Sequence, residues 1–195
     1  MSKLFYPINI NLDNLEIIII GGGNIALRKC KNFLEFGKSV TVLSPEFKRD
    51  FLEIEEKVDF IQDIFKEEYI DEFDMVIAAT DDKETNEEIA CICRKKSKFV
   101  NVVDNREFSD FITTSYLKRG DLLIGISTGG KVPALSSKIR RDLEEIYDED
   151  FSDYVEILAK IRKEVIKKYS DKTERRKVLK SLVELELDEL KNFEI

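Results

Sequence analysis

The sequence has no histidine and no tryptophan, and it holds only three cysteines in 195 residues. The lack of histidine excludes a Ser-His-Asp triad, a histidine general base and an imidazole-ligated metal site. Acid–base chemistry must therefore fall to carboxylate, lysine, tyrosine or cysteine side chains. Cys91 and Cys93 are close in sequence but Cys30 is remote, which fits neither a disulfide framework nor the usual zinc spacing. We predict reduced packing cysteines and no bound metal.

Long apolar runs are also missing. Stretches such as Ile17–Ile20 are far shorter than the roughly 18 to 20 residues that cross a bilayer. The amino terminus has no apolar signal core, so we expect a cytoplasmic protein that does not enter a membrane. The net charge of -8 argues against a nucleic-acid partner, and a composition of 43% hydrophobic and 37% charged residues is typical of a folded globular chain.

Strand patterns alternate with helical patterns as far as Val103. Leu15–Ile20 is β-branched and nearly all apolar, which is typical of a strand buried on both faces of a parallel sheet. The expected strands are 15–20, 39–43, 58–61, 74–80 and 99–103, and the expected helices are 27–36, a charged stretch before 58, and 83–96 capped by Asp81 and Asp82. This alternation predicts an α/β fold with a Rossmann-type doubly wound parallel sheet.

The rest of the chain has a different pattern. Residues 111–117 and 121–127 predict an antiparallel pair of strands, and the sequence is helical from Pro133 onward. In the helical part, two apolar faces are expected: Val155, Leu158, Ile161, Val165 and Ile166, and Val178, Leu182, Leu185 and Leu190. We expect three parts: a dinucleotide-binding Rossmann domain at 1–111, a small dimerisation and substrate-binding segment at 112–147, and a helical C-terminal domain at 148–195.

A glycine-rich turn joins the first expected strand to the first helix. In the pattern Gly21-x-Gly23-x-x-Ala26, the first glycine permits a tight bend and the second lets the backbone approach a pyrophosphate. Asn24 and Ile25 open the helix, whose N–H groups would face the anion. A merely structural turn is the alternative. Ser44 ends the second strand where an acidic residue usually holds the ribose, which leaves NAD or NADP undecided.

Polar groups stand at the carboxyl ends of the next strands. Thr80 and Asp81 follow the fourth strand, and Val103 and Asp104 end the fifth, where open α/β sheets bind ligands. Partial burial beside Val102 would raise the proton affinity of Asp104 and make it a candidate base. The alternative is a cap or turn residue.

A basic segment follows in this acidic chain. Residues 114–141 contain a single carboxylate, Asp121, and six cationic side chains. The cationic residues are Lys118, Arg119, Lys131, Lys138, Arg140 and Arg141. Such a cluster would suit a polyanionic small molecule, although a solvated basic face is an equal alternative on charge alone. The loop Ser127-Thr128-Gly129-Gly130 favours binding, because its amides and hydroxyls can hold carboxylates.

Four segments together resemble the precorrin-2 dehydrogenase family, which includes the dehydrogenase module of sirohaem synthases. They are GGGNIALRK at 21–29, AATDD at 78–82, NVVD at 101–104 and ISTGGKVPAL at 126–135. The match covers roughly residues 5 to 145, with the motifs in the family's order. It implies NAD-dependent removal of a hydride and a proton from precorrin-2, giving sirohydrochlorin for sirohaem or related tetrapyrroles.

The resemblance also implies roles for particular residues. It makes Asp104 the proton acceptor or substrate orienter, and it places the polycarboxylate substrate at Ser127, Thr128, Gly129, Gly130 and Lys131. It further implies a homodimer formed through 112–147. Some relatives insert Fe²⁺ into sirohydrochlorin, and that activity stays open here, as does the role of the helical tail. The rival readings are a nonenzymatic NAD-sensing Rossmann protein and a chelatase that binds no nucleotide.

Overall fold

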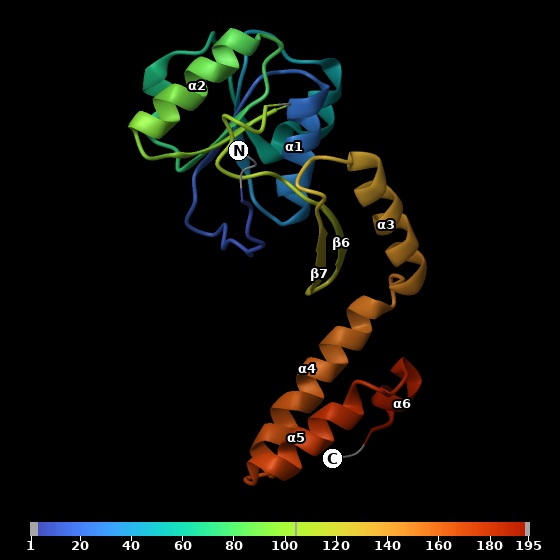
Figure 1. Cartoon of the computed structure of the whole chain (residues 1–195). Coiled ribbons are helices and arrows are strands. Elements are labelled where there is room, and N and C mark those ends of the chain that lie inside the picture. The colour runs from blue at the N-terminus through green and yellow to red at the C-terminus, as the bar shows by residue number, and fades with distance from the viewer. Residues whose placement is uncertain (1–3, 104, 194–195) are drawn as a thin grey trace. The chain divides into compact units, whose positions relative to one another are not determined.

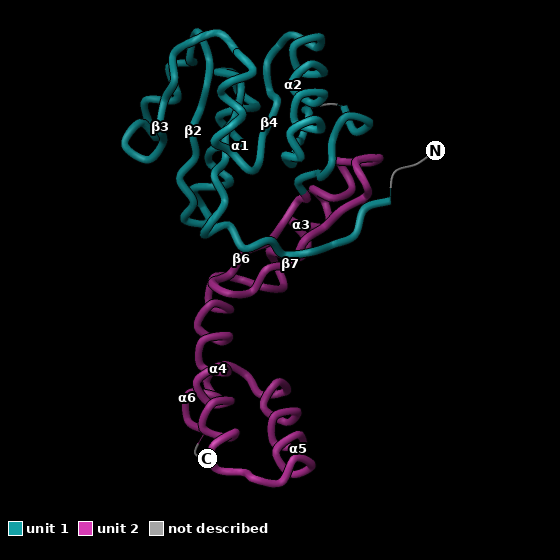
Figure 2. Tube along the Cα trace, turned by 90° about the vertical axis from the view of Figure 1, so that its left-hand side faces the viewer, with its two compact units in different colours: residues 1–113 teal, residues 114–195 magenta. Residues whose placement is uncertain are grey.

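Five parallel strands form the sheet of the first of two compact units. In the computed structural model, which describes residues 4–103 and 105–193, this unit spans 1–113 and the second spans 114–195 (Figure 2). The strands are β1 (Ile17–Ile20), β2 (Val40–Leu43), β3 (Val58–Ile61), β4 (Met75–Ala78) and β5 (Phe99–Val102), in the order β3-β2-β1-β4-β5. The order reverses between β1 and β4, so the predicted doubly wound Rossmann sheet is confirmed.

Strand β1 is the centre of the core. It pairs in parallel with β2 and β4, so that Ile19 lies opposite Val42 and Ile77. All four of its isoleucines are at most 2% exposed. Because side chains alternate along a strand, Ile17 and Ile19 enter one apolar cluster and Ile18 and Ile20 enter another on the opposite face.

Helices cover both faces of this sheet (Figure 1). Helix α1 (Asn24–Glu35) and the 3₁₀ segment η1 (Arg49–Lys57) pack on one face, while α2 (Lys83–Lys95) and the 3₁₀ turn η2 (Glu67–Ile70) pack on the other. Asp82 caps α2 as predicted, because its carboxylate accepts from the Thr85 N–H at 3.0 Å.

Two local predictions needed adjustment. The charged stretch before β3 is a 3₁₀ segment rather than an α-helix, and the side chains that it buries are Phe51 and Ile54. The strand expected at 111–117 begins only at Ser115. Phe111 instead packs on the core of the first unit, and its carbonyl accepts from the Asn101 amide at 3.0 Å.

The second unit begins with the predicted antiparallel pair, β6 (Ser115–Arg119) and β7 (Leu122–Ile126), followed by four helices in its described part. These are α3 (Pro133–Ile146), α4 (Phe151–Lys168), α5 (Lys172–Leu182) and α6 (Leu187–Lys191). Arg119 ties the hairpin to the junction of α3 and α4, donating to the carbonyls of Tyr147 at 3.1 Å and Asp148 at 2.9 Å.

Helices α4, α5 and α6 share a small apolar core. Ile161 and Val165 of α4 pack there with Leu182 and Leu190, as the predicted apolar faces require. Ile166, expected on the same face, is instead 38% exposed. The buried side chains of α4 are Ile161 and Val165, four residues apart, and Ile166 is one residue beyond Val165 and so points in a different direction around the helix. None of the helices in the described residues has the length and apolar composition needed to cross a membrane.

The cysteines give a simple test of this packing. Burial raises the pKa of the Cys30 and Cys93 thiols to about 12, whereas Cys91 lies exposed on α2. Because the thiolate is the reactive species, we expect one thiol to react rapidly with a disulfide reagent in the native protein and all three after unfolding. Cys91→Ser should abolish the fast reaction. Equal reactivity of all three native thiols would contradict the burial of Cys30 and Cys93.

Candidate functional site

The glycine turn after β1 is held tightly between its neighbours. The Gly21 N–H donates to the Leu43 carbonyl at 2.8 Å, and its φ of 134° is a conformation that favours glycine. A Cβ at Gly21 would lie 2.3 Å from the Ala79 carbonyl oxygen, and one at Gly22 would lie 1.9 Å from that of Glu46. These two glycines are therefore needed for packing.

Gly23 is different, because a Cβ there would meet no atom within 4 Å. Gly23 is the N-cap of α1 and supplies no side-chain cap, and the first turn of the helix carries no acidic residue. The N–H groups at Asn24 and Ile25 therefore open the helix with room in front of them and without a competing carboxylate. This open cradle fits the pyrophosphate of a dinucleotide.

A cation stands beside this cradle. The Lys48 ammonium donates to the Asn24 side-chain oxygen at 2.8 Å, and the Lys48 N–H donates to the Gly22 carbonyl at 3.0 Å. The loop after β2 is thus fastened to the glycine turn, with an exposed positive charge at the start of α1. Lys48 was not among the residues singled out from sequence, because only its contact with Asn24 reveals its place.

Ser44 ends β2 and is buried. Its N–H donates to the Ile61 carbonyl at 3.1 Å, and its hydroxyl donates to the Glu46 carbonyl at 2.7 Å. The same Glu46 carbonyl limits the space at Gly22. Ser44 therefore shapes the loop beside the glycine turn, and a contact between its hydroxyl and a ribose stays a prediction.

A buried amide organises the end of β4. Asn86 of α2 accepts from the Thr80 N–H at 3.1 Å and from its hydroxyl at 2.8 Å, and it donates to the Thr80 carbonyl at 3.1 Å. Thr80 is thereby fixed at the strand end, while Asp81 is exposed next to it. Asn86 was also missed from sequence, since a polar residue in a helix gives no sign that it faces a strand end.

The end of β5 carries the predicted catalytic position. The Val103 N–H donates to the Ala78 carbonyl at 2.9 Å and its side chain packs on the core. Asp104 comes next and lies outside the described residues. The segment beyond it is held by Ser109, whose hydroxyl accepts from the Val102 N–H at 2.9 Å and donates to the Asn105 carbonyl at 2.8 Å.

A buried lysine links α1 to this part of the sheet. The Lys29 ammonium donates to the Thr113 hydroxyl at 2.5 Å and to the Asn101 side-chain oxygen at 3.4 Å, and Lys29 is only 7% exposed. The Asn101 amide in turn donates to the Phe111 carbonyl. A sequence signal existed, because Lys29 falls on the same helical face as the apolar Ala26 and Phe33.

Replacing this lysine should destabilise the fold. Lys29→Met leaves the buried side-chain oxygen of Asn101 without its lysine donor and removes the hydrogen bond to the Thr113 hydroxyl, and we expect a loss of about 1–3 kcal/mol in the free energy of unfolding. Lys31→Met is the matched control, because Lys31 forms only a surface ion pair with Glu53 at 2.7 Å and should cost less than about 1 kcal/mol. Urea unfolding measures both, and equal losses would contradict a structural role for Lys29.

The predicted carboxylate-binding loop belongs to the second unit. Gly129 and Gly130 have positive φ angles, and the Thr128 hydroxyl accepts from the N–H of Val132, the N-cap of α3, at 3.1 Å. The Gly129 N–H donates to the Ser127 hydroxyl at 3.0 Å, and Lys131 is exposed. The loop has a defined shape that ends at the start of a helix.

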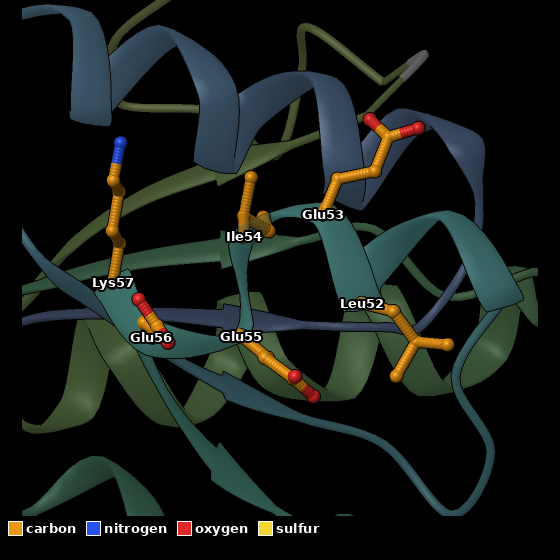
Figure 3. Close-up of a pocket in the computed structure, with 6 residues that line it drawn as sticks. All are labelled: Leu52, Glu53, Ile54, Glu55, Glu56 and Lys57. Carbon is orange, nitrogen blue, oxygen red and sulfur yellow. The ribbon is translucent and has the colours of Figure 1, made fainter.

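The structure thus gathers Gly21, Gly23, Asn24, Thr80 and Val103 at the carboxyl ends of β1, β4 and β5. A hollow of about 150 Å³ lies elsewhere, on η1, which leads into the amino end of β3. Figure 3 shows Glu53 and Lys57 on one side of that segment and Leu52 and Glu55 on the other. Because these side chains diverge, the hollow is no candidate site.

Comparison with known proteins agrees with this reading. Residues 8–115 match a family model described as "Putative NAD(P)-binding", and residues 119–146 match one described as "Sirohaem biosynthesis protein central". A solved structure of SirC, described as a precorrin-2 dehydrogenase, has a TM-score of 0.78 and 25% sequence identity, with 96% of each chain covered. The chain belongs to the "Putative NAD(P)-binding" family and shares its fold with this precorrin-2 dehydrogenase.

The chain is also similar to part of several sirohaem synthases. The sirohaem synthase of Tolumonas auensis is 32% identical over 173 residues, and that of Psychromonas ingrahamii is 37% identical over 168 residues. These stretches cover 89% and 84% of the present chain but only 37% and 36% of the relatives. The chain therefore spans little more than a third of the length of these relatives.

Proposed function

We propose that this protein is an NAD-dependent precorrin-2 dehydrogenase that converts precorrin-2 to sirohydrochlorin. The observation that carries the proposal is the open, uncapped start of α1 at Gly23, in a chain that shares its fold over 96% of its length with a precorrin-2 dehydrogenase. That cradle supports dinucleotide binding. The similarity to SirC, described as a precorrin-2 dehydrogenase, supports precorrin-2 as the substrate. We place the protein in the cytoplasm.

The chain's own residues have distinct roles in this scheme. The α1 N–H groups beyond Gly23 hold the pyrophosphate, with Lys48 adding positive charge, and Ser44 lies toward the adenosine ribose. Bound NAD supplies the hydride acceptor. Thr80, Asp81 and Val103 stand at the ends of β4 and β5, toward the nicotinamide half of the crevice.

Asp104 is proposed to accept the proton that leaves precorrin-2, or to orient the substrate for its loss. The sequence places it directly after Val103, at the end of β5. Loss of a hydride to the nicotinamide and of a proton to a carboxylate together account for the two hydrogens removed. No histidine is needed for this chemistry.

The polycarboxylate substrate is proposed to contact Ser127, Thr128, Gly129, Gly130 and Lys131. The left-handed glycines, the hydroxyls and the exposed ammonium give this loop donors that suit carboxylates. We further propose that the protein is a homodimer whose interface is formed by residues 112–147, and that residues 148–195 are a separate helical domain. The amide and ammonium donors remain the basis for assigning the substrate to this loop.

An anaerobic steady-state assay tests the proposal. Purified protein is mixed with precorrin-2 and either NAD or NADP, and NADH or NADPH is followed by absorbance. We expect NAD-dependent turnover, and the comparison of the two nucleotides resolves the preference that Ser44 leaves undecided. NAD binding without any turnover would favour a nonenzymatic nucleotide sensor instead, and Fe²⁺ added after the reaction would reveal any chelatase activity.

A further inference from the structure

Arg106 lies in the loop that follows β5, and one N–H donor of its guanidinium is buried without a hydrogen-bond acceptor among the described residues. This donor is the Nε. The guanidinium carbon lies 5.5 Å from the centre of the Phe5 ring. A buried donor that is left unpaired costs free energy, so an arginine held in this way indicates an interaction completed by a ligand.

The loop around Arg106 is fixed rather than loose. The Asn105 side-chain oxygen accepts from the Glu107 N–H at 3.1 Å, and the Arg106 carbonyl accepts from the Ser109 N–H at 3.3 Å. From α2, Arg94 donates to the Glu107 carbonyl at 3.0 Å. The backbone on both sides of Arg106 is therefore held by hydrogen bonds, within the loop and to α2.

The charge around Arg106 also favours an anion. Within the described ranges 4–103 and 105–193, no carboxylate forms an ion pair with it. Contact with the Phe5 ring involves the face of the guanidinium and uses none of its in-plane N–H donors. The planar fork of arginine suits two-point binding of a carboxylate.

We propose that Arg106 binds one carboxylate side chain of the tetrapyrrole substrate, as a subsite additional to the Ser127–Lys131 loop. This rests on the proposed function. In this sheet β5 lies beyond β4 on the side of the crevice away from β2, so Arg106 is on the nicotinamide side. Substrate must approach that side to give up its hydride, whereas the nucleotide phosphates lie at the start of α1.

Direct binding is the first test, because it does not require turnover. Uroporphyrin, a stable polycarboxylate tetrapyrrole, is titrated into wild-type protein, Arg106→Gln and Arg106→Lys, and its absorbance and fluorescence are followed. We expect Arg106→Gln to weaken binding about tenfold. Arg106→Lys, which keeps the charge but not the fork, should fall between the two. NAD affinity should be the same in all three proteins.

Arg94→Gln is the matched control. Arg94 also lies over a phenylalanine, 5.3 Å from the centre of the Phe108 ring, but it donates to the Glu107 carbonyl. We expect this variant to lose thermal stability and to keep its tetrapyrrole affinity. Equal uroporphyrin affinity in wild type and Arg106→Gln would overturn the proposal, as would an equal loss in Arg94→Gln.

Activity then separates this proposal from the proposed function. In the precorrin-2 assay, Arg106→Gln should raise KM about tenfold and leave kcat within about twofold. If wild-type protein shows no turnover but uroporphyrin binding still depends on Arg106, the dehydrogenase assignment fails and the anion subsite stands. If turnover is normal and neither KM nor uroporphyrin affinity changes in Arg106→Gln, only the subsite fails.

Discussion

Asp104→Ala is expected to lower kcat with precorrin-2 by roughly 100-fold or more, which is the usual scale for losing general acid–base help. Asp104 follows Val103 at the end of β5, and with no histidine in the chain it is the residue assigned to take the proton. NAD affinity should be unchanged, because the nucleotide is held by the turn after β1. Steady-state kinetics and an NAD titration measure the two effects.

Two further variants sharpen this test. Asp104→Asn keeps the size of the side chain but cannot take a proton, so it should be as impaired as the alanine variant. Asp110→Asn changes a carboxylate in the same loop that accepts from the Val100 N–H at 3.2 Å, and it should affect stability more than kcat. Near-normal turnover in Asp104→Asn would refute a proton-accepting role.

Gly23→Ala is expected to weaken NAD binding at least tenfold, about 1.4 kcal/mol, with little change in the fold. The φ of -91° at Gly23 suits any residue, and a methyl group would meet no atom within 4 Å. That methyl group would instead occupy the space in front of the α1 N–H groups, where a pyrophosphate must approach. The loss of a glycine N-cap should cost only about 1 kcal/mol of stability.

Gly37→Ala provides the opposite control. Gly37 follows α1 at its other end, with a φ of 76° and open space around it. Alanine there should cost about 1–2 kcal/mol of stability and leave NAD affinity unchanged. Calorimetric NAD titration and urea unfolding measure both variants. Unaltered NAD affinity in Gly23→Ala would show that the nucleotide does not approach the turn after β1.

The fold was predictable where the pattern is local. Four consecutive isoleucines at β1 followed by glycines left few alternatives to a buried strand and a tight turn, and α1 and α2 appear close to their predicted bounds. The 3₁₀ form of η1 was not predictable, because Phe51 and Ile54 are spaced in a way that suits either helix type.

The polar contacts of the site were less predictable, because their partners are distant in sequence. Lys29 pairs with Thr113, 84 residues away, and Lys48 reaches back to Asn24 across 24 residues. Asn86 resembles any polar residue on a helix until the end of β4 is placed beside it. Glycine motifs identify the cradle, but only the folded chain shows which glycine leaves open space.

A single-turnover experiment tests the central claim most directly. Excess protein and NAD are mixed anaerobically with limiting precorrin-2, and the spectra of NADH and sirohydrochlorin are recorded together. The dehydrogenase account predicts that both products appear at the same rate, with one NADH for each sirohydrochlorin. Sirohydrochlorin formed without NADH, or no reaction while NAD stays bound, would contradict it.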